Sequence, residues 1–140
     1  MKKRVLILCT GNSARSQMAQ AIINHERGEV WEAHSGGTHP APRVNPYAIR
    51  ALAEIGIITE GQPPTHVDAY RDQPFDLVIT VCDDAAENCP LWLGSGKKQH
   101  IGFVDPAAAT GSDEAILQAF RSVRDAIRER IIAAVDQASL

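Results

Sequence analysis

Two short, uninterrupted apolar runs constrain the fold of this chain more than any other feature of its sequence. Val5-Leu6-Ile7-Leu8 and the stretch from Phe75 to Val81 carry aliphatic and β-branched side chains at consecutive positions. Such runs are typical of parallel strands that are buried on both faces of a sheet. Weaker strands are expected from Trp31 to His34 and from His100 to Val104. Because parallel strands need a crossover connection, helices are expected between these segments.

Helical patterns occupy the segments between the expected strands. Met18, Ala21 and Ile22 repeat at helical spacing, and Asn45-Pro46 is a cap followed by proline at the first helical position. The longest helix begins after Thr110 or Ser112, and its apolar face is formed by Ile116, Phe120, Val123, Ile127 and Ile131. The sequence therefore predicts an α/β fold: a single domain over residues 1–140, in three layers, with a four-stranded parallel sheet flanked by helices.

Charge and hydropathy exclude several functional classes. The net charge of −3 argues against general nucleic-acid binding, because such proteins neutralise many phosphates at once. The apolar segment from Val5 to Cys9 is too short to span a bilayer or to form the core of an export signal. We therefore expect a cytoplasmic protein that binds neither nucleic acid nor membrane. Its three cysteines should then lie in a reducing compartment.

The first strand is joined to the first helix by the loop Cys9-Thr10-Gly11-Asn12-Ser13-Ala14-Arg15-Ser16. Gly11 and Asn12 can adopt left-handed backbone angles, which lets successive N–H groups surround a tetrahedral oxyanion. The helix that begins near Ala14 adds its positive end, and Arg15 can grip two anion oxygens. The same field favours the thiolate of Cys9, to which Ser16 could donate a hydrogen bond. The loop thus predicts an anion site with a nucleophile; a buried strand-end cysteine beside an ordinary turn is the alternative.

Three further residues follow predicted strands at the edge of the sheet where ligands bind in such folds. Cys82 follows the second apolar run, Cys89 lies seven residues later, and Asp105 follows the last strand. Within one helix, residues at that spacing lie about 10 Å apart along the axis, whereas a disulfide needs Cα atoms within about 7 Å. A Cys82–Cys89 bridge would therefore require this segment to unwind. Two inert core cysteines are the alternative, and the cysteine and histidine spacing argues against zinc.

The segment Cys-Thr-Gly-Asn-Ser-Ala-Arg-Ser-Gln-Met-Ala resembles the start of low-molecular-weight tyrosine phosphatases and, more closely, of thioredoxin-coupled arsenate reductases. The resemblance extends over nearly the whole chain, through Ser35-Gly36-Gly37, Asn45-Pro46, Thr80 to Pro90, Gly102 to Ala107 and Phe120 to Ile127. Phosphatases of this fold carry aromatic residues just after the Asp-Pro pair, where this chain has Ala107. They also lack the downstream cysteine pair. The resemblance therefore implies an arsenate reductase with a low-molecular-weight phosphatase-like fold.

The resemblance also implies a role for each site residue. Cys9 attacks arsenate, Arg15 holds the oxyanion, and Asp105 protonates the leaving oxygen. Cys82 then attacks the Cys9–arsenic adduct and releases arsenite. Cys89 attacks Cys82 in turn, and thioredoxin reduces the resulting Cys82–Cys89 disulfide. Phosphate or sulfate should act as a weaker mimic of arsenate; no cofactor is implied, and the chain is expected to be a monomer.

Two departures from the family pattern limit what the resemblance implies. Ala14 stands where many relatives have a cysteine that is not part of the relay. Relatives also bind potassium through residues that match Asn12, Gln20 and Ser35, but Gln20 replaces a carboxylate, so no metal site is expected here.

Two alternative functions stay open at this point. One is a phosphomonoesterase that hydrolyses a Cys9 phosphoenzyme, for which the Cys82/Cys89 pair is unnecessary. The other is a non-catalytic oxyanion-binding module. Such a module would tolerate the loss of Cys9, whereas a reductase would not.

Overall fold

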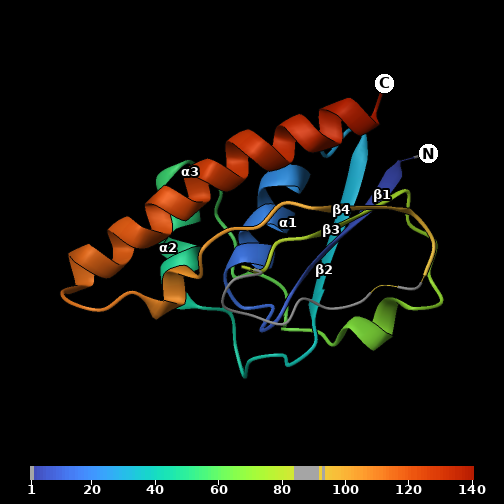
Figure 1. Ribbon diagram of the computed structural model, residues 1–140. Coiled ribbons are helices and arrows are strands. Elements are labelled where there is room, and N and C mark those ends of the chain that lie inside the picture. Colours follow the sequence, from blue (N-terminus) through green and yellow to red (C-terminus); the bar gives the residue numbers. More distant parts are fainter. Residues whose placement is uncertain (1, 84–91, 93) are drawn as a thin grey trace.

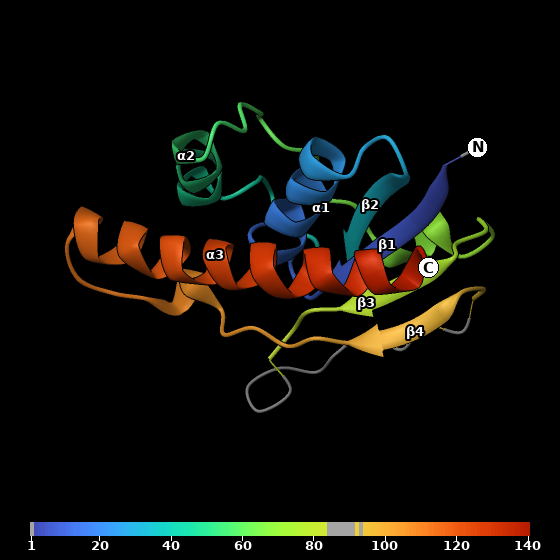
Figure 2. The same cartoon turned by 90° about the horizontal axis from the view of Figure 1, so that it is seen from above.

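The computed structural model describes residues 2–83, 92 and 94–140 (Figure 1). Within these residues, four strands form one parallel sheet in the order β2-β1-β3-β4. The strands are β1 (Lys3–Cys9), β2 (Trp31–Gly37), β3 (Leu77–Thr80) and β4 (Lys97–His100). Figure 2 shows them side by side, with β2 and β4 at the two edges. The predicted α/β class and the four-stranded parallel sheet are confirmed.

The sheet is covered on both faces. The helices α1 (Arg15–Glu26), α2 (Pro46–Glu54) and α3 (Asp113–Ala138) lie on one face, where they share a core with Val5 and Ile7 of β1. Leu6 and Leu8 alternate to the other face. There they pack against Val67 of the short 3₁₀ helix η1 (Val67–Tyr70) and its neighbours. Because both faces are covered, all four apolar residues of this run are fully buried, as a central parallel strand requires.

The fourth strand differs from the prediction. The sequence favoured His100–Val104, but β4 is Lys97–His100, and all four of its side chains are exposed. A strand at the edge of a sheet is defined by its backbone pairing and tolerates lysines, which also discourage pairing with other chains. Ile101 and Phe103, whose apolar character led to the prediction, are buried just after the strand. Their N–H groups donate to the carbonyls of Thr80 and Val81.

The helix starts follow the predicted capping chemistry. The Asn45 side chain accepts a hydrogen bond from the Tyr47 N–H at 2.9 Å, and the Ser112 hydroxyl accepts one from the Ala115 N–H at 3.1 Å. Figure 1 shows α3 running along the molecule, with α2 beside its first half and α1 further along. Both chain ends lie at the amino-terminal end of β1, away from the loop that follows this strand.

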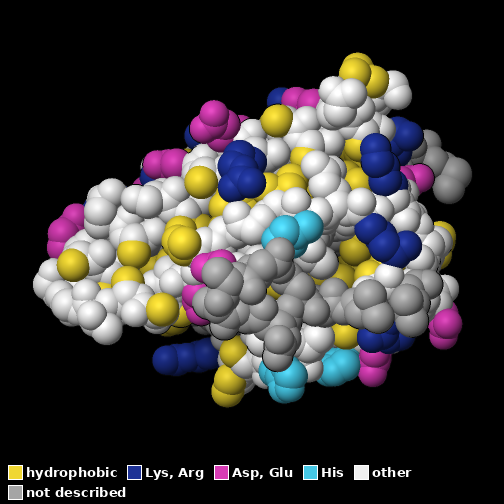
Figure 3. All heavy atoms as spheres, in the orientation of Figure 1, with side chains coloured by type: hydrophobic (Ala, Val, Ile, Leu, Met, Phe, Trp, Pro, Cys, Tyr) yellow, Lys and Arg dark blue, Asp and Glu magenta, His cyan; other side chains and the backbone are white. Residues whose placement is uncertain are grey.

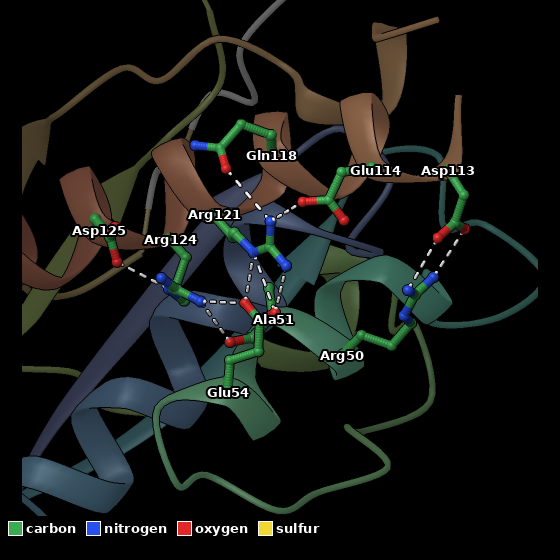
Figure 4. Close-up of polar contacts among 9 residues, drawn as sticks. All are labelled: Arg50, Ala51, Glu54, Asp113, Glu114, Gln118, Arg121, Arg124 and Asp125. Atoms are coloured by element: carbon green, nitrogen blue, oxygen red, sulfur yellow. Dashed lines mark hydrogen bonds and ion pairs between the residues drawn. The ribbon is translucent and has the colours of Figure 1, made fainter. Parts of the chain in front are cut away.

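Ion pairs fasten α2 to α3 (Figure 4). Arg50 of α2 pairs with Asp113 at 2.9 Å, and Glu54 pairs with Arg121 at 2.7 Å and with Arg124 at 2.9 Å. The hydrogen bond from Arg121, followed by that from Arg124, lowers the pKa of Glu54 to about 2, although partial desolvation opposes the shift. These ion pairs hold α2 in place against α3. The segment 39–45, which directly precedes α2, contacts the loop that follows β1.

The surface carries both signs of charge. Figure 3 shows Lys and Arg side chains on the same face as Asp and Glu side chains, with apolar atoms between them. In the described part of the chain, no helix is long and apolar enough to cross a membrane.

Candidate active site

Cys9 is the last residue of β1, and the loop that follows it folds back over its sulfur. The thiol is buried, with 2% of the residue exposed. Its Sγ lies 2.8 Å from the Ser16 hydroxyl and accepts a hydrogen bond from the Asn12 N–H at 3.1 Å. Helix α1 begins at Arg15, so its positive end points into the same region. The predicted nucleophile therefore lies among hydrogen-bond donors and the start of a helix.

A pocket of about 260 Å³ opens above this sulfur. Its lining consists of eight of the predicted site residues and one neighbour: Cys9, Thr10, Gly11, Asn12, Ser13, Ala14, Arg15, Asp105 and Ala107. Ser16 is buried behind it. Residues from two distant parts of the sequence thus meet at the carboxyl ends of the strands, where the α/β topology predicted a ligand site.

Arg15 and Asp105 face each other across the pocket. Arg15 is buried, and its Nη1 donates to the carbonyl of Phe103 at 3.1 Å, which fixes the guanidinium from the side of the last loop. Its Nη2 lies 3.9 Å from Asp105 Oδ2. The Asp105 side chain is 42% exposed and also accepts a hydrogen bond from the Ala107 N–H at 2.9 Å. This carboxyl group is therefore reached by solvent while it lines the Cys9 pocket.

Asn12 connects the loop to the rest of the sheet edge. It has a positive φ of 50°, as the sequence predicted, whereas Gly11, for which the same was predicted, does not have a positive φ. Its Nδ2 donates to the hydroxyls of Ser16 at 2.8 Å and Ser35 at 2.9 Å, and its Oδ1 accepts from the Thr65 N–H at 2.9 Å. A single fully buried amide thus orients the hydroxyl that contacts Cys9.

The potassium-type site of the family does not fit these residues. The Ser35 hydroxyl accepts from Asn12 and donates to Gln20 Oε1, so these groups satisfy one another by hydrogen bonding. Gln20 is a neutral amide, so this cluster lacks the negative charge with which a carboxylate would attract a cation. Among the residues described, no group of three or more His, Cys, Asp or Glu side chains could hold a metal ion.

Cys82 lies shortly after the end of β3, the strand that pairs with β1. Leu8 pairs with Thr80 in the parallel register, and the Val81 N–H donates to the Leu8 carbonyl at 2.9 Å. Cys9 therefore lies at the end of β1, and Cys82 lies just after the end of the neighbouring strand β3. Cys82 is fully buried and is part of a disulfide bond, whereas Cys9 is a free thiol. The predicted third cysteine, Cys89, lies outside the described residues.

Sequence reasoning missed two of the residues that hold the loop. The Gln17 side chain is buried and donates to the Asn12 carbonyl at 3.0 Å, and Thr65 reaches Asn12 from a distant segment. A polar residue at a helix position that faces the core could have indicated the role of Gln17. Nothing in the sequence indicates the contact between Thr65 and Asn12. It is made by a backbone N–H, which every residue except proline has, and it depends on the path that brings residue 65 back to the loop.

This chain is similar to known proteins in sequence and in fold. An arsenate reductase from Halalkalibacterium halodurans is 44% identical over 130 residues, which are 93% of each chain. A solved structure of an arsenate reductase in a phosphate-binding state has a TM-score of 0.77 at 26% identity and covers 97% of this chain and 98% of that one. A thioredoxin-dependent arsenate reductase from Corynebacterium glutamicum has a TM-score of 0.63 at 26% identity, over 99% of this chain and 64% of that one.

The family model for low molecular weight phosphotyrosine protein phosphatases matches residues 4–139. This match includes the loop from Cys9 to Ser16, the helices α1, α2 and α3, and Asp105. Together with the parallel sheet and the Cys9 pocket, it shows that the chain belongs to the low molecular weight phosphotyrosine protein phosphatase family.

Proposed function

We propose that this protein is an arsenate reductase that uses Cys9, Cys82 and Cys89 in sequence and is recycled by thioredoxin. The observation that carries the proposal is a free Cys9 thiol in an anion pocket, with the oxidised Cys82 at the neighbouring strand end. The names of the relatives support arsenate as substrate, and one of them is a thioredoxin-dependent enzyme. A monomeric, cytoplasmic protein is part of the same proposal.

The first step is a substitution at arsenic. The Cys9 thiolate attacks arsenate, a sulfur–arsenic bond forms, and one arsenic–oxygen bond breaks. Asp105 supplies the proton with which the leaving oxygen departs as water, as expected of a carboxyl group at the pocket wall. Arg15 and the loop N–H groups hold the remaining oxygens.

The reduction follows in two thiol exchanges. Cys82 attacks the Cys9 sulfur, the sulfur–arsenic electron pair stays on arsenic, and arsenite leaves as a Cys9–Cys82 disulfide forms. Cys89 then attacks Cys82 and releases the Cys9 thiolate. Two electrons reach arsenic, and the Cys82–Cys89 disulfide carries the oxidation to thioredoxin, whose two thiols become a disulfide. A free Cys9 together with an oxidised Cys82 is the state expected at the end of this sequence.

A phosphomonoesterase is the second candidate, because the family match and the anion pocket are shared by both activities. The side chain that follows Asp105-Pro106 favours the reductase. Ala107 lines the pocket there, and it gives an aryl ring no aromatic wall to stack on. Small aryl phosphates should therefore be hydrolysed weakly.

Arsenate-dependent oxidation of NADPH in the presence of thioredoxin and thioredoxin reductase tests the proposal. The complete mixture should oxidise NADPH, whereas mixtures without arsenate or with Cys9→Ser should not, since a serine hydroxyl has no nearby base to activate it. Efficient hydrolysis of phosphate esters without any arsenate-dependent oxidation would identify the protein as a phosphatase instead.

The order of the relay requires single turnovers of cysteine variants. Cys89→Ala should release one arsenite per chain and stop with a Cys9–Cys82 bond. Cys82→Ala should stop earlier, with little arsenite released. Mass mapping of the disulfides after one equivalent of arsenate distinguishes these states, and a Cys9–Cys89 bond in the parent protein would contradict the proposed order.

A further inference from the structure

Four consecutive carbonyl groups of the anion loop each accept a hydrogen bond from a donor outside the loop. The pairs are His39 N–H to Thr10 O, Ala41 N–H to Gly11 O and Asn45 N–H to Ser13 O, each at 2.9 Å, and Gln17 Nε2 to Asn12 O at 3.0 Å. Three of the donors belong to the segment 39–45, and the fourth is a side chain of α1. These hydrogen bonds therefore hold four consecutive peptide groups of the loop from its outer side.

These outer bonds determine where the loop N–H groups point. In a trans peptide unit, the C=O and the N–H point in opposite directions. A carbonyl held on the outside therefore turns the N–H of the following residue toward the pocket, which applies to Gly11, Asn12, Ser13 and Ala14. The Asn12 N–H has this direction, since it donates to Cys9 Sγ at 3.1 Å. By the same geometry, the N–H groups of Gly11, Ser13 and Ala14 should point into the pocket that these residues line.

The sequence of the 39–45 segment matches this task. Pro40 and Pro42 alternate with the donors His39 and Ala41. Proline has no N–H and restricts φ, so residues 39–42 offer donors only at alternate positions and have little freedom to move them. The Ser13 hydroxyl also donates to the Arg43 carbonyl at 3.0 Å and fastens the loop to the same segment.

The fourth donor, Gln17, is fixed by its own contacts. It is 3% exposed, and besides its bond to Asn12 its Nε2 donates to the Gln62 carbonyl at 2.8 Å. Its Oε1 accepts from the Gln62 N–H at 3.1 Å. Because both ends of the amide are engaged, the donor that faces Asn12 cannot rotate away without breaking other bonds.

We propose that Gln17 and the backbone N–H groups of His39, Ala41 and Asn45 are positioning groups that set the oxyanion affinity of the loop. They touch neither the anion nor the sulfur, and they act by holding four peptide units in the orientation that binds. This inference rests on the oxyanion site of the proposed function but requires no thiol exchange.

Two substitutions remove single outer donors. Ala41→Pro deletes one N–H from an already proline-rich segment, and Ala41→Gly is its control because it keeps that N–H. Gln17→Met removes the amide with little change of volume. Gln17→Met loses three side-chain hydrogen bonds. Its control is Gln73→Met, which loses two, with Arg4 and Ala69, but lies beside η1 and away from the loop.

The readouts are the dissociation constant for inorganic phosphate, by calorimetry, and the free energy of unfolding in urea. Ala41→Pro and Gln17→Met should each weaken phosphate binding about tenfold, in proportion to one misplaced hydrogen-bond donor. The two controls should bind within about twofold of the parent, because Ala41→Gly keeps the N–H that bonds the loop and Gln73 lies away from the loop. A purely structural role would lower the stability of all the variants and leave the phosphate affinity unchanged.

Amide hydrogen exchange on the parent protein keeps the inference testable even where a variant does not fold. Phosphate should slow exchange at Gly11, Ser13 and Ala14. Phosphate binding that protects none of these amides would overturn the inference, as would folded Ala41→Pro and Gln17→Met variants that bind phosphate like the parent. A protein that meets these expectations but does not reduce arsenate would overturn the proposed function alone.

Discussion

Substitution of Asn12 tests the physical account of the anion loop most directly. This residue is fully buried and has a φ of 50°, where a side chain with a Cβ is strained unless it is Asn or Asp. Its side chain makes three hydrogen bonds, two to serine hydroxyls and one to the Thr65 N–H. Asn12→Gly removes the hydrogen bonds and relieves the strain, whereas Asn12→Ala removes the hydrogen bonds and adds strain.

The expected losses of unfolding free energy follow from these contacts. Each lost hydrogen bond costs about 1 kcal/mol, and the Thr65 N–H loses the acceptor it has inside the fold, so Asn12→Gly should lower the free energy of unfolding by about 3 kcal/mol. The left-handed backbone costs a non-glycine residue about 1–2 kcal/mol, partly offset by the greater freedom of unfolded glycine. Asn12→Ala should therefore lose about 4 kcal/mol and be the less stable of the two variants.

Urea unfolding followed by tryptophan fluorescence measures the loss of unfolding free energy in both Asn12 variants. The redox state of the cysteines should be the same in every sample. Asn24 provides a control at which the alanine and glycine variants should have the opposite order of stability. It lies within helix α1, and its side chain forms hydrogen bonds with the backbone of Ala33. There the alanine variant should be more stable than the glycine variant by about 1 kcal/mol. The reasoning fails if Asn12→Ala is at least as stable as Asn12→Gly, or if both lie within about 0.5 kcal/mol of the parent.

Three further perturbations test other parts of the molecule. Phe120 is fully buried and stacks on Tyr47 at a centroid distance of 5.4 Å, so Phe120→Ala should cost about 3–5 kcal/mol of unfolding free energy in urea, against little change for the exposed neighbour Gln118→Ala. The pKa of Glu54 is lowered to about 2 from an ordinary value of 4.5, so its contribution to stability should be complete above pH 4.5 and should decline as pH falls toward 2. Urea titrations at a series of acidic pH values should show this decline, and Glu54→Gln should reduce it; an unchanged pH dependence in that variant would contradict the role of the cluster in Figure 4. A Cβ at Gly37 would clash with the Thr10 carbonyl oxygen, so Gly37→Ala should displace the loop and weaken phosphate binding measured by calorimetry. Gly56→Ala, where the added Cβ meets no atom within 4 Å, is strained by its φ of 84° but should bind phosphate normally.

The sequence by itself determined the parts of this protein that depend on local pattern. Consecutive apolar residues at Val5 to Leu8 identify a central strand, because only a strand covered on both faces buries every side chain. The caps at Asn45 and Ser112 follow from short-range hydrogen bonding, and the spacing of Cys9, Asn12 and Arg15 within one loop predicts an anion pocket. Each of these features involves residues close together in the chain.

Only the tertiary structure decided which distant groups complete the site. The edge strand Lys97–His100 is defined by its pairing with β3, which its charged sequence does not signal. Gln17 and Thr65 hold Asn12, and the 39–45 segment holds the loop carbonyls, through contacts that form only after the chain has folded back on itself. Backbone N–H groups exist at every residue except proline, so no residue type indicates which of them will be used. Their choice depends on the path of the chain, and that path is set by the packing of the whole domain.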